Sequence, residues 1–131
     1  MSVYLDASAV VKVITPEPES SALVRMLAPR AEQATSALCL AEVPRALRRM
    51  HATPTTMRRA ERALQQLTLI HVDRAILETA GELVSPDLRT LDAVHLASAL
   101  SLGAELEAVV TYDRRLAAAA RAAGVAVLAP A

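Results

Sequence analysis

The segment Val3–Lys12 reads VYLDASAVVK, and the rest of the chain is best interpreted from it. Val3–Leu5 is short and apolar, which indicates a buried strand, whereas Ala7–Ile14 carries apolar residues at helical spacing. Asp6 therefore lies where a strand changes into a helix, and ligands bind at such positions in open parallel α/β sheets. Because burying an unpaired charge is costly, this carboxylate needs a partner, and we predict that the partner is a metal ion.

The composition favours one domain spanning residues 1–131. With 131 residues and 53% hydrophobic content, the chain can bury one sizeable core but not two. It has no apolar run of about 18 residues and no basic leader, so we expect a cytoplasmic protein without a membrane segment. The single cysteine, Cys39, excludes an internal disulfide and is interpreted as a small core residue.

The charge distribution gives only local information about partners. The 14 basic and 14 acidic residues cancel, so the net charge offers no argument for nucleic acid. Six arginines between Arg45 and Arg62 stand against Glu61 alone, and this segment could contact phosphates or simply face solvent. The only aromatic residues are Tyr4 and Tyr112, which excludes the base-stacking platforms of single-strand binders.

Strand-like and helical segments alternate along the chain. We expect strands at Val3–Leu5, Ala31–Ser36, Leu67–Val72, Ala108–Thr111 and Val125–Leu128. We expect helices over Ala7–Ile14, from Ser20 or Ser21 to Ala28, Leu38–Met50, Thr53 to Leu67, Ala75–Val84, Thr90 to Gly103 and Asp113–Ala123. This alternation predicts an α/β fold, a five-stranded parallel sheet with helices on both faces.

Two helices carry more detailed expectations. In the helix from Leu38, the apolar face should consist of Leu40, Val43, Leu47 and Met50. Pro44 suits a helix interior poorly because it lacks the backbone N–H, so this helix should be kinked or begin later. Caps are expected from Ser20 or Ser21, Asp73, Thr90 and Asp113.

Four acidic side chains are expected to meet at the carboxyl edge of the sheet. Asp6 ends the first strand, Glu42 lies on the helix after the second strand, Asp92 is in the first turn of the helix from Thr90, and Asp113 follows the fourth strand. Two carboxylates about 5 Å apart repel by roughly 3 kcal/mol at an effective dielectric of about 20. A divalent cation reverses this repulsion, and oxygen-only ligands suit Mg²⁺ or Mn²⁺.

Such an ion lowers the pKa of a bound water and neutralises charge on a phosphodiester. The predicted reaction is therefore metal-assisted phosphodiester hydrolysis. We assign Asp6 and Asp92 to the principal ion and Glu42 to the attacking water, which it would orient or deprotonate. Asp113 would ligate the ion directly or through water.

Each acid except Asp6 also has an ordinary structural interpretation. Asp92 and Asp113 stand where helices favour acids, because of capping and the helix dipole. Glu42 could instead pair with Arg45 or Arg49 at helical spacing. The case for a site therefore depends on the four acids together.

Other polar residues near the acids are open to two interpretations. Ser8 and Thr111, each two residues from an acid, could hold metal waters or phosphate oxygens, or bond the local backbone. His95, one turn after Asp92, is favoured as a buried histidine with satisfied hydrogen bonds rather than as a ligand. Lys12 could contact a phosphate, balance the acids or lie in solvent.

Four segments taken together resemble the PIN-domain ribonucleases, and in particular the VapC-type toxins of bacterial toxin–antitoxin modules. They are Tyr4–Ala9 (YLDASA), Leu40–Val43 (LAEV), Arg89–Ala97 (RTLDAVHLA) and Val110–Leu116 (VTYDRRL), in the family's order. The resemblance maps the family's acids onto Asp6, Glu42, Asp92 and Asp113, and its accessory hydroxyls onto Ser8 and Thr111. It implies a five-stranded parallel sheet flanked by helices, Mg²⁺ or Mn²⁺ dependence and endonucleolytic cleavage of RNA. It also implies a homodimer held inactive by a VapB-like antitoxin, whose C-terminal segment would lie over the acids.

Two other functional classes stay open at this point. A response-regulator-like phosphoacceptor would use Asp73, after the third strand, but it needs a lysine after the fifth strand, and the only lysine is Lys12. A noncatalytic binding protein could keep the PIN fold without activity. The presence of all four acids argues against this last alternative.

Overall fold

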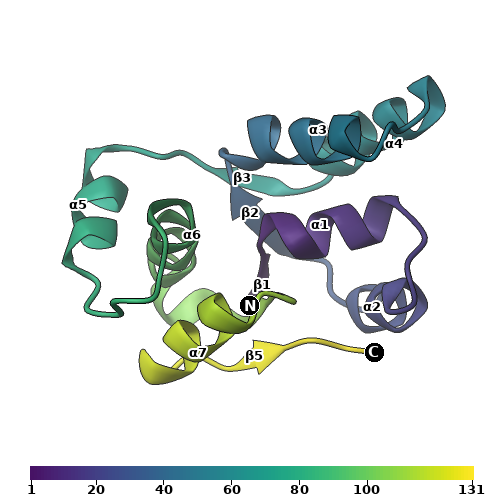
Figure 1. Cartoon of the computed structure of the whole chain (residues 1–131). Coiled ribbons are helices and arrows are strands. Elements are labelled where there is room, and N and C mark those ends of the chain that lie inside the picture. Colours follow the sequence, from purple (N-terminus) through teal and green to yellow (C-terminus); the bar gives the residue numbers. More distant parts are fainter.

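A five-stranded sheet in the order β3-β2-β1-β4-β5 runs through the molecule (Figure 1). The computed structural model describes residues 1–131, with strands β1 (Ser2–Leu5), β2 (Gln33–Ser36), β3 (Thr68–Ile70), β4 (Leu106–Val110) and β5 (Val127–Leu128). The helices are α1 (Ala7–Ile14), α2 (Ser20–Leu27), α3 (Cys39–Arg49), α4 (Pro54–Gln65), α5 (Arg74–Glu82), α6 (Thr90–Leu100) and α7 (Arg114–Ala122), with a 3₁₀ turn η1 (Gly103–Glu105). All four strand pairings are parallel, so the predicted α/β fold is confirmed.

Helices cover both faces of the sheet, and the alternation of side chains along β1 shows how. Val3 and Leu5 pack with the apolar faces of α1 to α4, whereas Tyr4 between them packs with α6 and α7. A smaller apolar cluster joins α5 to α6. Figure 1 accordingly places α1, α2, α3 and α4 apart from α5, α6 and α7. No helix combines the length and hydrophobicity needed to cross a membrane.

The central strand β1 leads directly into α1, as the opening segment predicts. Asp6 is the N-cap of α1, and its side chain accepts a hydrogen bond from the Ala9 amide. The Asp6 amide donates to the Val110 carbonyl, so the acid stays attached to β4 beyond the end of the paired strands. The carboxyl ends of β1 and β4 therefore lie side by side.

The predicted helix caps are confirmed in part. Asp73 and Asp113 cap α5 and α7 with their side chains. Thr90 is the first residue of α6 rather than its cap, and Arg89 before it makes no capping hydrogen bond. The Ser20 hydroxyl bonds the carbonyl oxygens of Lys12, in the last turn of α1, and of Thr15, so α2 also begins without a side-chain cap. Packing of their apolar faces is sufficient to hold both helices.

Helix α3 differs from the prediction in its buried face. It begins at Cys39 and holds Pro44 beyond its first turn, so the start of the helix does not accommodate the proline, and the alternative of a kink stays a prediction. Its buried residues are Cys39, Val43 and Leu47, spaced four apart, whereas Leu40 and Met50 are 56% and 50% exposed. The predicted apolar face is therefore only half correct, although Cys39 is a core residue as expected. The helix limits elsewhere differ by a few residues, as at Leu67 and Val84, which lie beyond α4 and α5.

Candidate active site

The carboxylate of Asp6 is buried and held by three donors. It is 4% exposed, and its Oδ1 accepts hydrogen bonds from Ser8 Oγ at 2.6 Å and from the Ala9 amide at 3.0 Å. Oδ2 accepts from Thr111 Oγ1 at 2.6 Å. Burial raises the pKa of Asp6, and the hydrogen bonds from Ser8 and Thr111 oppose that rise. The protein itself thus supplies the partners that we expected a metal to supply, and they fix the orientation of the carboxylate.

The two hydroxyls also connect Asp6 to the loop that carries Asp113. Ser8 Oγ accepts from the Tyr112 amide at 3.1 Å, and Thr111 Oγ1 accepts from the Asp113 amide at 3.0 Å. Both side chains are therefore engaged with Asp6 and with this loop. Their position favours a positioning role over direct contact with a phosphate.

Asp113 is a helix cap with one oxygen to spare. Its Oδ1 accepts from the Arg115 amide at 2.8 Å and from the Leu116 amide at 3.0 Å. Oδ2 forms no hydrogen bond. The capping interpretation is thus correct, and it leaves an oxygen that a cation or a water could use.

Asp92 is the acid without a partner. It lies in the first turn of α6 and accepts no hydrogen bond. Burial raises its pKa, the neighbouring charges of Asp113, Asp6 and Glu42 raise it further, and His95 opposes the rise. Asp92 therefore lies close enough to the other three predicted acids for their negative charges to repel its own.

Glu42 is bonded to a histidine instead of an arginine. Its Oε1 lies 2.6 Å from Nε2 of His95, whose Nδ1 lies 2.7 Å from the hydroxyl of Tyr4. Neither Arg45 nor Arg49 forms an ion pair with Glu42, so that alternative is wrong. His95 is 2% exposed with both ring nitrogens bonded, which agrees with the interpretation as a satisfied buried histidine.

Two sets of side chains could be considered as metal ligands. Cys39, Glu42 and His95 have ligand atoms within 4.8 Å of one another, whereas no three of the four acids do. The thiol is already bonded to Thr35 Oγ1 at 3.1 Å, and burial raises its pKa to about 12. Glu42 and His95 bond each other, so within this first set only Glu42 Oε2 has no hydrogen bond. The set is thus held together by its own hydrogen bonds.

The four acids fit a hard divalent cation if water completes its coordination. No three of them bring one oxygen each within 4.8 Å of one another, so a single cation would reach some of the acids through water. Mg²⁺ commonly keeps several waters in proteins.

Two hollows flank the acids. The larger, about 560 Å³, extends from Ser8 and Glu42 across α1 and α3 and includes Arg45, Arg49 and the apolar Leu38 and Leu91 in its lining. The smaller, about 330 Å³, is lined only by Arg89, Asp92, Asp113, Arg114 and Arg115. The acids thus stand between two groups of arginines.

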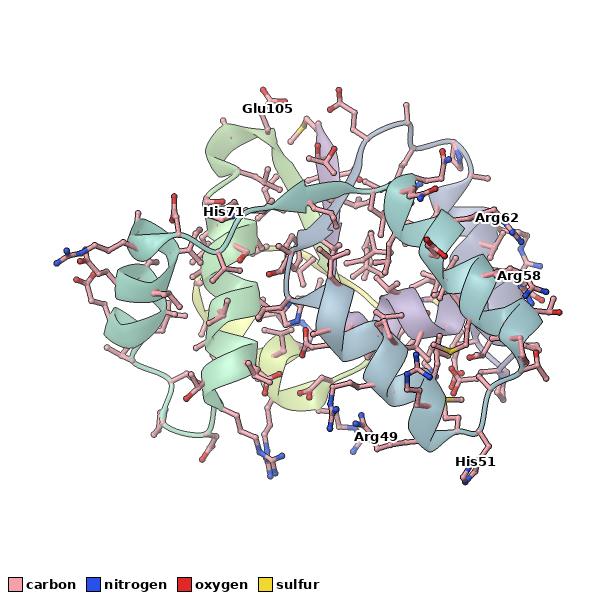
Figure 2. All side chains as sticks on the ribbon, turned by 90° about the horizontal axis from the view of Figure 1, so that it is seen from above. Arg49, His51, Arg58, Arg62, His71 and Glu105 are labelled. Carbon is pink, nitrogen blue, oxygen red and sulfur yellow. The ribbon has the colours of Figure 1, made fainter.

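The predicted basic segment does not form one surface. Figure 2 shows Arg58 and Arg62 on α4, well separated from Arg49 on α3. Arg45 and Arg49 line the hollow beside Glu42. Only this part of the segment borders the acids.

Lys12 forms ion pairs with glutamates and also lines the larger hollow, so its contact with a phosphate stays a prediction. Its ammonium group pairs with Glu19 at 3.0 Å and Glu17 at 3.6 Å, and it lies 4.9 Å from the ring centre of Tyr112. The lysine therefore ties α1 to the loop that precedes α2.

Comparison with known proteins identifies the family of the chain. The family profile described as PIN domain matches residues 3–122. Ribonuclease VapC46 of Mycobacterium tuberculosis is 46% identical over 98% of both chains, and Ribonuclease VapC35 of the same organism is 43% identical over 98% of this chain and 96% of its own.

Solved structures share the fold. Mycobacterium tuberculosis VapC20, described as a Sarcin-Ricin loop cleaving toxin, has a TM-score of 0.77 at 21% identity, covering 98% of this chain and 99% of its own. A toxin–antitoxin complex from Klebsiella pneumoniae has a TM-score of 0.74 at 20% identity, covering 98% of each chain. The structural matches concern the fold alone, whereas the profile and the sequence identities establish descent. The chain therefore belongs to the PIN-domain family and, within it, to the VapC-type ribonucleases.

Proposed function

We propose that this chain is a toxin endoribonuclease that hydrolyses RNA phosphodiester bonds at Asp6, Glu42, Asp92 and Asp113, with Mg²⁺, or Mn²⁺ in its place. The observation that carries the proposal is Asp92, a partly buried carboxylate that has no hydrogen bond and feels the negative charge of the other three acids. A protein gains no stability from such an arrangement, which is typical of functional sites. The relatives of this chain that are named ribonucleases support the same reaction.

The donor set suits a hard divalent cation. Asp6, Asp92 and Asp113 would hold it through oxygens, some of them by way of water. When bound, such a cation neutralises charge on the phosphodiester and lowers the pKa of water. Asp113 offers its free Oδ2, and Asp6 offers an oxygen that Thr111 already orients.

Ser8 and Thr111 would orient an acid of the site, and Glu42 would activate the attacking water. Ser8 and Thr111 hold the Asp6 carboxylate in one orientation, so it needs no rearrangement when substrate arrives. Glu42 has one oxygen bonded to His95 and lines the larger hollow, where its second oxygen can accept a proton from the attacking water.

The surrounding charges favour a nucleic-acid backbone as the substrate, and the relatives that are named ribonucleases support RNA. Five arginines line the two hollows, and none of them forms an ion pair; they are Arg45, Arg49, Arg89, Arg114 and Arg115. Unpaired guanidinium groups suit phosphate oxygens. A strand crossing the acids would meet arginines on both sides, which positions the backbone without reading its sequence.

Replacing Arg114 and Arg115 together by glutamine should weaken RNA binding roughly uniformly across sequences. For single-stranded RNA, the plot of the log of the association constant against the log of the salt concentration should become less steep by about 1.4, since each phosphate contact contributes about 0.7. Binding titrations at several salt concentrations, made without divalent cations, measure the slope. The matched control replaces Arg58 and Arg62 on α4, which should leave it unchanged. An equal change in both double variants would contradict the assignment of these arginines to the substrate path.

The proposed partners are an antitoxin and a second copy of the chain. We propose that it forms a homodimer and that a VapB-like antitoxin holds it inactive in the cytoplasm, as one neighbour of this fold is a toxin–antitoxin complex. The larger hollow combines apolar Leu38 and Leu91 with charged Arg45 and Arg49 beside Glu42. A peptide segment of the antitoxin with an apolar and an acidic side would fit there. We also propose that residues 1–131 act as one domain.

The decisive test is the chemistry of the cut. The chain, freed of any copurifying protein, should cut end-labelled RNA at internal bonds in Mg²⁺. Because an external water attacks, one oxygen from H₂¹⁸O should enter the new phosphate, and RNA carrying a 2′-deoxy sugar at the cut should still be cleaved. A Glu42→Gln preparation controls for contaminating nucleases. Products with 2′,3′-cyclic phosphates would show that the RNA's own hydroxyl attacks, and would refute hydrolysis by water.

The phosphoacceptor alternative is not supported. Asp73 is exposed and its carboxylate caps α5, while Lys12 is paired with glutamates at the other end of α1. Each of these two groups is thus engaged in another contact.

A further inference from the structure

Two consecutive hydrogen bonds run through the interior from β1 to α3. The Tyr4 hydroxyl lies 2.7 Å from His95 Nδ1, and His95 Nε2 lies 2.6 Å from Glu42 Oε1. Tyr4 and His95 are 0% and 2% exposed, and their rings meet edge to face at 5.9 Å. Strand β1 and helix α6 are thereby joined to a carboxylate of the candidate active site, which lies on α3.

The direction of the bonds follows from the protons available. An ionised carboxylate can only accept, so His95 Nε2 carries the proton that bonds Glu42 Oε1. In the neutral imidazole Nδ1 then has no proton and accepts from the Tyr4 hydroxyl. The hydroxyl thus selects the tautomer of His95 that can hold Glu42.

We propose that Tyr4 and His95 are positioning residues for Glu42, a role that rests on the proposed endoribonuclease function. A glutamate has three rotatable bonds, so without an anchor its carboxylate would sample many orientations. The bond from His95 fixes Oε1, while Oε2 forms no hydrogen bond and the side chain remains 22% exposed at the hollow. Oε2 is consequently directed to the place where water would be activated.

A purely structural role is the competing explanation. The same two bonds could simply satisfy polar groups in the core, in which case Phe at position 4 and an apolar residue at 95 would affect folding alone. The positioning role makes a different prediction, because it concerns the catalytic step and the tautomer rather than substrate binding. Partners of this kind, one bond removed from the reacting groups, typically contribute 10-fold to 100-fold in activity.

The test compares Tyr4→Phe, His95→Leu and His95→Gln with the wild type. The glutamine amide can place an N–H donor near the position of Nε2, whereas leucine cannot. In His95→Leu, kcat should fall by about 10-fold to 100-fold with KM changed by less than about twofold, and His95→Gln should recover a large part of the loss. Tyr4→Phe should lower kcat by about 3-fold to 10-fold, because only the tautomer preference is lost. Thermal unfolding confirms that each variant is folded.

The tautomer has a readout that does not depend on activity. The chain has three histidines, and His51 and His71 are exposed, so ¹⁵N NMR of the imidazoles can isolate His95. The wild type should show proton-bearing Nε2 and unprotonated Nδ1, and Tyr4→Phe should show a mixture of tautomers.

Each outcome decides between the explanations. Three results would overturn the positioning role and leave the proposed function intact. They are a proton on Nδ1 in the wild type, a variant effect confined to KM, and full activity in folded Tyr4→Phe and His95→Leu. If the wild type itself cleaves no RNA in the end-group experiment, the proposed function is wrong and the positioning role falls with it.

Discussion

Asp6→Asn is expected to lower the rate of RNA cleavage by about 10³-fold or more, which corresponds to about 4 kcal/mol of transition-state stabilisation. The substitution removes a negative charge from the centre of the candidate metal site while preserving the shape of the side chain. Asparagine caps helices as well as aspartate does, so α1 should still form. Single-turnover cleavage of end-labelled RNA measures the loss, and circular dichroism confirms the fold.

The control for this experiment is the same substitution at an unrelated acid. Asp87 is exposed in the turn between α5 and α6, so Asp87→Asn should cleave RNA at the wild-type rate. A folded Asp6→Asn protein with activity within tenfold of the wild type would exclude Asp6 from the mechanism.

Removing divalent cations should have an effect of the same size. Chelation by EDTA should reduce cleavage by at least about 10³-fold, and Mg²⁺ or Mn²⁺ should restore it, because three carboxylates cannot bind a phosphodiester without a neutralising charge. Activity that survives exhaustive chelation would contradict the metal assignment. Titration with each ion separately would show which one supports turnover.

The stability of the metal-free protein supplies a second measurement of the same site. Burial raises the pKa of both Asp6 and Asp92 in the folded state, so above the ordinary aspartate pKa the folded chain binds more protons than the unfolded chain. Unfolding free energy should therefore fall as the pH rises through these raised values, and saturating Mg²⁺ should flatten that slope. Asp92→Asn should raise Tm in EDTA by a few degrees, because it relieves the repulsion from the other acids. This corresponds to about 1 kcal/mol or less of unfolding free energy, since the side chain of Asp92 is partly exposed. Asp87→Asn should leave Tm unchanged.

Local patterns predicted most of the fold. The limits of α1 and the place of Asp6 followed from the change in spacing after Leu5, and the caps Asp73 and Asp113 followed from residue type and position. The face of α3 was predicted poorly because Leu40, an apolar residue, lies on its exposed side. Periodicity reports an amphipathic helix, but it cannot report which neighbours cover each side.

The sequence indicated that four acids would lie near one another but not which side chains would support them. Strand ends and helix starts carried the first of these predictions. The bonds of His95 to Tyr4 and Glu42 join residues 91 and 53 positions apart, and no local pattern indicates such contacts. Tyr4 looked like one more apolar residue of a buried strand. Arg114 and Arg115 follow Asp113 directly, which was a usable signal for arginines beside the site.

The dual use of Asp6 as helix cap and candidate ligand has a genetic consequence. Codons for aspartate and asparagine differ by a single base, and asparagine would keep the cap on α1. If the proposed function holds, one point mutation would thus remove the activity of the chain while leaving its surface and fold unchanged. An inactive copy of this kind would compete with active copies for the proposed antitoxin, so its presence in a cell would release active copies.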